Sequence, residues 1–230
     1  MINMCNFISR HRYSAALRLI PLVLAALAWS STAFCGEIHD AVRDGDLEKV
    51  RALLKSHPAL VFATDKDGAT PLHYAAVYGR KEAAELLLAN KADIEAKTNE
   101  GTTPLQAAAG GGRTAIVELL IANKANVNAT NKRDATALHW AASKGYADIV
   151  KLLLASKADV DARTNEGATP LMMAAQEGYK DVAELLVASK ARANARDNEG
   201  HTALDWAIHN DHKDVADLLR PVGGNWSLMN

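Results

Sequence analysis

Cysteine is almost absent from the chain, whose 230 residues include only Cys5 and Cys35. Small secreted domains that depend on disulfides carry several cysteines at regular spacings. Residues 36–230 contain none, so this part of the chain can have neither an internal disulfide nor a cysteine nucleophile.

An excess of positive charge is also missing, because the formal net charge is −1. Nucleic-acid-binding domains normally show a basic stripe. Here Lys and Glu alternate, as in residues 81–85, which is the ordinary pattern of a solvated helix face. We therefore expect no nucleic-acid partner.

Catalytic motifs are lacking as well. The run Gly110-Gly111-Gly112 is not followed by the lysine of a phosphate-binding loop. Ser143, Ser156 and Ser189 have no paired histidine in the sequence. We expect no enzyme activity, no cofactor and no small-molecule substrate.

What the chain does contain is a repeat. Threonine recurs every 33 residues and is followed each time by Pro or Ala and then Leu, at Thr70, Thr103, Thr136, Thr169 and Thr202. A fixed period of this length predicts a stacked array of similar units, because one such unit cannot bury its own apolar face.

The repeated unit resembles the ankyrin repeat. The first copy reads Thr70-Pro71-Leu72-His73, then Ala75-Ala76, Gly79 and the apolar run 86–88, and the later copies follow it in phase over about residues 37–224. The resemblance implies an all-α repeat fold, an ankyrin-repeat solenoid of helix-turn-helix units joined by β-turn or hairpin loops.

The residues themselves favour this arrangement. Thr70 is a good helix N-cap and Pro71 suits the first helical position, so a helix is predicted over 71–78. Gly79 permits a tight turn, and the apolar spacing predicts a second helix over 81–89. Gly101 then supplies the positive φ of a turn.

One departure from the family pattern is systematic. Lysine stands where ankyrin units usually carry glycine after the second helix, at Lys91, Lys124, Lys157 and Lys190. A left-handed lysine costs roughly 1 kcal/mol relative to glycine, although a cation near a helix C-terminus recovers part of that cost. We attach no function to these lysines.

We expect the repeat to comprise an N-terminal capping unit without the threonine turn (36–65), four full repeats (66–98, 99–131, 132–164 and 165–197) and a C-terminal capping repeat (198–224). A signal peptide (1–35) is expected before this array and a tail (225–230) after it.

The first 35 residues have the order of a signal peptide. Arg10, Arg12 and Arg18 precede an apolar stretch over 19–29, and small residues follow. The apolar stretch is shorter than the roughly 20 residues that span a bilayer. Cleavage is expected after Ala33 or after Cys35, with a periplasmic or secreted product of a Gram-negative bacterium. The alternative is an inner-membrane anchor, with the segment retained.

The resemblance implies a protein-binding module that is monomeric alone and contacts another protein through its turn tips (fingers) and its short first helices (palm). The residues expected at the fingers are Lys66, Asp67, Glu100, Lys132, Arg133, Glu166 and Glu199. Those expected in the palm are Tyr74, Val77, Tyr78, Gly110, Gly111, Trp140, Ser143, Lys144, Gln176 and Glu177.

Two features of that surface carry hypotheses. The small residues 107–112 predict a notch walled by Tyr74 and Tyr78 on one side and by Trp140 and Lys144 on the other, although these aromatic rings could instead be core. Lys132 and Arg133 make the third finger basic, which favours a partner with an acidic patch there. Asp134 replaces the turn glycine of that finger, so its backbone is expected to be distorted.

A metal site is the sharpest alternative chemistry. His209 and His212 are three residues apart, and His201 and Asp211 lie nearby. A site would need further ligands that the sequence does not supply, so no metal is expected, and a metal- or ligand-binding sensor ranks third among the functions. His73 and His139 are better explained as hydrogen-bonding residues of the repeat.

Overall fold

The structure is a computed structural model that describes residues 36–222, and the predicted signal peptide, the tail 225–230 and both cysteines lie outside this range. After a helical segment at 36–44, its elements are α3 (Leu47–Ser56), η1 (Pro58–Phe62), α4 (Pro71–Tyr78), α5 (Lys81–Ala89), α6 (Pro104–Gly110), α7 (Thr114–Ala122), α8 (Ala137–Ser143), α9 (Ala147–Ala155), α10 (Pro170–Glu177), α11 (Lys180–Ala188), α12 (Ala203–His209) and α13 (Lys213–Leu219).

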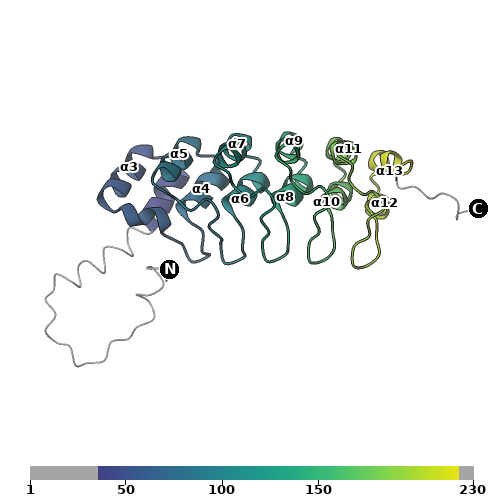
Figure 1. Cartoon of the computed structure of the whole chain (residues 1–230), viewed down its shortest axis with the longest axis horizontal. Coiled ribbons are helices and arrows are strands. Elements are labelled where there is room, and N and C mark those ends of the chain that lie inside the picture. Colours follow the sequence, from purple (N-terminus) through teal and green to yellow (C-terminus); the bar gives the residue numbers. More distant parts are fainter. Residues whose placement is uncertain (1–35, 223–230) are drawn as a thin grey trace, which may run out of the picture.

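The helices form two layers, with a row of loops on one side. Figure 1 shows α5, α7, α9, α11 and α13 side by side in an outer layer, and α4, α6, α8, α10 and α12 in an inner layer from which the loops project. Residues 36–222 contain no β-strand. The predicted solenoid is confirmed, and so are the helices predicted over 71–78 and 81–89.

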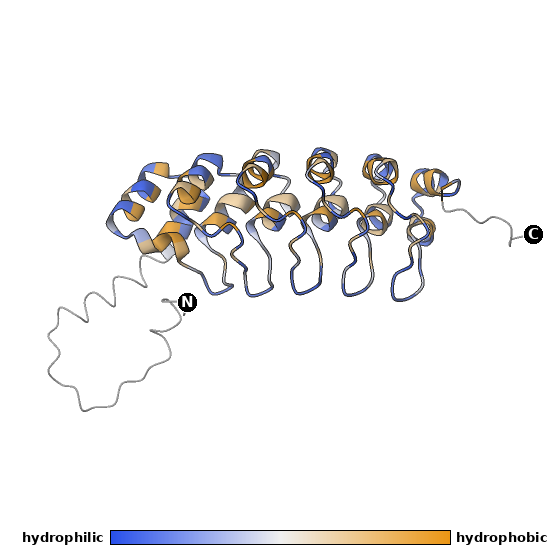
Figure 2. Cartoon of the chain, viewed as in Figure 1, coloured by the Kyte–Doolittle hydropathy of each residue, from blue (hydrophilic) through white to orange (hydrophobic). Residues whose placement is uncertain are grey.

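The core lies between the two layers. The paired alanines of the inner helices are fully buried, as at Ala75 and Ala76 and again at Ala141 and Ala142, and their small side chains let neighbouring units approach closely. Leucines such as Leu72 and Leu87 fill the space between the layers. The loops project from the inner helices, and their outer ends are mainly hydrophilic (Figure 2), as expected of segments that face solvent.

In three of the repeats, a histidine or glutamine at the third helical position ties one unit to the next: His73, Gln106 and His139. Thr70 N–H donates to His73 Nδ1 (3.1 Å), so the proton is on Nε2, which donates across to Thr102 O (2.9 Å). His139 repeats this pattern with Thr136 N and Ala168 O. The role expected for the two histidines is therefore confirmed.

The lysines after the second helices adopt the left-handed conformation, with φ of 68° at Lys91, 67° at Lys124, 66° at Lys157 and 68° at Lys190.

Among the helices of residues 36–222, none combines the length and apolar character needed to cross a bilayer.

Candidate protein-binding surface

The fingers are rigid because each is closed at its base and bonded to its neighbour. In the first finger, Asp65 Oδ1 accepts the N–H groups of Asp67 (2.9 Å) and Ala69 (2.8 Å). Neighbouring fingers are joined through their backbones by Asn99 N to Asp67 O, Lys132 N to Glu100 O, Asn165 N to Arg133 O and Asn198 N to Glu166 O, at 2.8–3.0 Å. The row of fingers is thus one connected surface.

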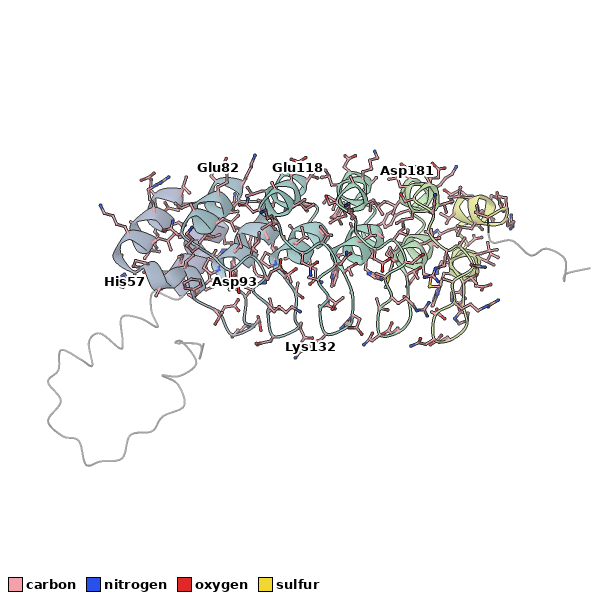
Figure 3. The ribbon with its side chains drawn as sticks, viewed as in Figure 1. His57, Glu82, Asp93, Glu118, Lys132 and Asp181 are labelled. Atoms are coloured by element: carbon pink, nitrogen blue, oxygen red, sulfur yellow. The ribbon has the colours of Figure 1, made fainter. Side chains whose placement is uncertain are left out.

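The third finger is not distorted, which corrects the expectation drawn from Asp134. This residue has φ 56° and occupies the same left-handed region as the glycines of the other fingers. Asn131 Oδ1 closes the finger by accepting from Arg133 N (2.9 Å) and Ala135 N (3.0 Å). The tip residue Lys132 is exposed (Figure 3), and neither it nor Arg133 takes part in an ion pair within residues 36–222.

The palm residues differ in their exposure. Val77 and Tyr78 at the end of α4 are 41% and 43% exposed, which is high for large apolar side chains. Lys144, Gln176 and Glu177 are also exposed. The remaining predicted palm residues are less accessible: Tyr74, Gly110, Gly111, Trp140 and Ser143 are half-buried. The Ser143 hydroxyl donates to Trp140 O (3.1 Å).

The prediction of a notch over residues 107–112 is corrected, because the glycine run does not form an open floor between two aromatic walls. Trp140 lies against Gly110, because a Cβ atom there would be 3.6 Å from its Cε3 atom. A Cβ on Gly111 would lie 3.2 Å from the carbonyl oxygens of Val77 and Ala107. Trp140 therefore fills the space that Gly110 leaves, and Gly111 is a packing position between α4 and α6.

A hollow does exist one unit closer to the N-terminus. It has a volume of about 540 Å³ and lies between the first two fingers and the helices α4 and α6. Its lining includes Asp67, Tyr74, Val77, Tyr78, Glu100 and Ala107. The Tyr74 and Tyr78 wall predicted for the notch is thus present, whereas Trp140 and Lys144 do not belong to this hollow.

Sequence reasoning missed a polar pair between finger base and palm. Asp65 Oδ2 accepts the Tyr74 hydroxyl (2.9 Å), and Asp197 Oδ2 accepts Trp206 Nε1 (2.9 Å). Both pairs are nine residues apart in the sequence. Where the base is a threonine, the residue nine positions later has no polar side-chain atom, as with Ala107 after Thr98. This spacing is the signal that would have revealed the pairs.

The third unit breaks the pairing. Trp140 follows Asn131 by nine residues, but its buried Nε1 is the one side-chain nitrogen or oxygen of residues 36–222 that is buried without a hydrogen-bond partner. Asn131 uses Oδ1 for the finger backbone, and its other terminal atom is a donor that cannot accept from an indole N–H.

These contacts shift the ionisation of the paired groups. Burial and the hydrogen bond to Asp65 raise the pKa of Tyr74 to about 12. Burial acts to raise the pKa of Asp197, but hydrogen bonds from Trp206, His201 and Glu199 outweigh it and hold that pKa below its ordinary value. Burial lowers the pKa of His73 and of His139, so both rings are neutral at pH 7.

The histidines of the last unit contact other groups and not one another, and His201 and His209 both pack edge-on against Trp206. His212 Nε2 lies 3.0 Å from Gln176 O, His209 packs edge-on against Trp206, and His201 lies near Asp197 and Glu199. Over residues 36–222, no three His, Cys, Asp or Glu side chains gather in a way that could hold a metal ion.

A family model described as "Ankyrin repeats (3 copies)" matches residues 38–98, 90–164 and 138–228. The chain belongs to this family. Ankyrin repeats are typically non-catalytic binding modules and generally mediate protein–protein interaction.

Similar proteins share short parts of the array. "Ankyrin repeat domain-containing protein 13C-B" of Xenopus laevis is 44% identical over 55 residues, which is 24% of this chain and 10% of that protein. "Transient receptor potential cation channel subfamily A member 1 homolog" of Caenorhabditis elegans is 44% identical over 55 residues, 24% of this chain and 4% of the channel homolog. "Probable E3 ubiquitin-protein ligase XBOS32" of Oryza sativa subsp. japonica is 49% identical over 49 residues, 21% of this chain and 10% of the ligase. The matched part of this chain spans at most a tenth of these three relatives.

Proposed function

We propose that the array is a non-catalytic adaptor, inhibitor or assembly factor that binds another protein through its palm and fingers. The observation that carries this proposal is the exposure of Val77 and Tyr78 beside a connected row of fingers. Large apolar side chains exposed on a rigid surface are typical of protein-binding sites. The proposed role needs no catalytic residue, cofactor or metal.

The proposed location is the periplasm or the medium outside the cell. It rests on the basic, apolar and small-residue order of residues 1–35. The mass of the purified chain tests it, because cleavage after Ala33 or Cys35 removes the N-terminal segment. An intact mass with the chain found in membranes would instead favour a membrane-tethered scaffold.

Affinity capture tests the binding proposal, with the chain purified in the form in which its cells make it as the bait. Tyr78→Ala removes an exposed ring from the palm and should abolish capture of a specific partner without unfolding the array. Glu118→Ala is the matched control, because Glu118 is exposed on α7 in the outer layer, away from the fingers (Figure 3).

Capture that is lost with Tyr78→Ala and kept with Glu118→Ala supports the palm as the binding surface. Equal capture by both variants argues against the palm and moves the site to the finger tips or the ends of the array. Gly111→Arg is unsuitable as a probe of the surface, because its Cβ would crowd two backbone carbonyls.

A further inference from the structure

The hollow between the first two fingers is acidic. Two of its lining residues, Asp67 and Glu100, carry carboxylates, and no lysine or arginine lines it. Both acids are exposed at equivalent positions on neighbouring fingers, and the bond from Asn99 N to Asp67 O (2.8 Å) fixes the spacing of the two loops.

Among residues 36–222, no cationic side chain lines this hollow. His73 also lines it, but its Nε2 donates to Thr102 O, and burial lowers its pKa, so the ring is uncharged at neutral pH. The nearby Arg113 points its Nε to Val77 O (2.9 Å). Lys66 belongs to the first finger but does not line the hollow.

The palm side of the hollow is aromatic and held in place. Tyr74 packs edge-on against His39, with ring centroids 4.9 Å apart, and its hydroxyl donates to Asp65. Tyr78 lies beside it, with centroids 6.0 Å apart and an interplanar angle of 34°. A phenol that donates to a carboxylate has a more electron-rich ring, and the face of such a ring attracts cations.

We propose that this hollow receives a lysine or arginine side chain from a basic segment of the protein partner. The inference rests on the proposed protein-binding function and names the chemistry of the partner at that site. The alkyl stem would pack on Val77, and the charged end would lie over the ring of Tyr78, beside the carboxylates of Asp67 and Glu100.

Other occupants fit the hollow less well. An acidic or phosphorylated segment would face two carboxylates of like charge. A wholly apolar side chain would remove water from those carboxylates without supplying a partner for them. A basic side chain satisfies both the aromatic wall and the acidic rim, because its stem is apolar and its end is charged.

The test uses the purified chain and three blocked tripeptides, Gly-X-Gly, in which X is arginine, citrulline or norleucine. NMR titration should show saturable shifts at Tyr78 and Ala107 with the arginine peptide. Citrulline keeps the shape of arginine without its charge, so its peptide should bind roughly fivefold more weakly, the loss expected when about 1 kcal/mol of charge interaction is removed.

Variants separate the charge from the ring. Tyr78→Leu, which keeps apolar area but removes the aromatic face, should weaken the arginine peptide about fivefold, whereas Tyr78→Phe should leave it within about twofold. Asp67→Asn with Glu100→Gln should weaken it by no more than the loss of charge in citrulline does, up to about fivefold, and more so at low salt. Glu118→Gln is the control, because Glu118 is exposed on α7 in the outer layer, away from the hollow, and should change nothing.

The outcomes distinguish this inference from the broader function. If the norleucine peptide binds as well as the arginine peptide, or if neutralising Asp67 and Glu100 has no effect, the cation site is refuted. A partner captured through Tyr78 would then still support protein binding. If the arginine peptide binds as described but no partner is captured by the chain or any of its variants, the hollow stands as a cation site and the proposed function fails.

Discussion

Replacing Asn131 with aspartate should stabilise the array, because it supplies the acceptor that Trp140 lacks. The first and last units show the outcome, since Asp65 and Asp197 close their fingers with Oδ1 and accept a palm hydroxyl or indole with Oδ2. Asn131 already places its Oδ1 on the finger backbone. The substitution therefore changes one terminal atom from a donor to an acceptor.

The magnitude follows from opposing contributions. A buried donor without a partner costs about 1–3 kcal/mol, and a hydrogen bond to a charged group contributes about 1.5–3 kcal/mol. Removing the new carboxylate from water opposes this gain. In the last unit, however, the Asp197 side chain is only 7% exposed and its pKa is still lowered, so the hydrogen bonds there outweigh burial. We expect a net gain of about 1 kcal/mol for Asn131→Asp at pH 7.

Urea unfolding at pH 7 measures the gain as a higher midpoint at an unchanged slope. The gain should vanish in a Trp140→Phe background, because phenylalanine has no N–H group to donate. It should also shrink in acid, since the carboxylate contributes only above the pKa of the folded state and the contribution is lost as the pH falls through that value. An equal gain with and without the indole N–H, or a lower midpoint, would refute the reasoning.

Three further predictions concern the same elements. First, replacing both histidines (His73→Gln with His139→Gln) should flatten the dependence of the free energy of unfolding on pH below about pH 6.5, as measured by urea unfolding between pH 5 and 8. Burial lowers the pKa of both histidines in the folded state, so only the unfolded chain takes up these protons as the pH falls. Glutamine, which the second unit carries naturally at this position, keeps the hydrogen bonds, so an unchanged curve would contradict this assignment. Lys124→Gly should raise the free energy of unfolding by up to about 1 kcal/mol, because it relieves a positive φ; Lys124→Ala, as the control, should not. Charge reversal at Lys132 and Arg133 should slow association with an acidic partner, and more so at low salt in stopped-flow measurements; rates that do not change would exclude a contact at the third finger.

The helices were predictable because their signals are local. Thr70 and Pro71 start a helix and Gly79 ends it, and these signals recur in each inner unit with only small changes. The resemblance placed a left-handed residue after each second helix but left open whether lysine would change the turn, and the structure keeps the left-handed backbone, as at Lys91.

The site was harder to predict because it depends on contacts between units. That Trp140 covers Gly110 is decided by the direction of a side chain on the neighbouring helix. The third finger kept its shape because Asp134 tolerates the left-handed region while Asn131 closes the loop. The hollow arises only where two fingers and the helices α4 and α6 come together, so the sequence supplied Tyr74 and Tyr78 but not the open hollow beside them.

The pairing of finger base and palm has a consequence for exchanging units between such arrays. A recombination point between residues 65 and 66 separates Asp65 from Tyr74, its partner in the next unit. A cut one residue earlier keeps the acceptor and the donor in one cassette. A cassette that begins at 65 should thus carry the Asp65–Tyr74 pair with it, whatever unit it is placed beside, and a cut just before residue 197 keeps Asp197 with Trp206 in the same way.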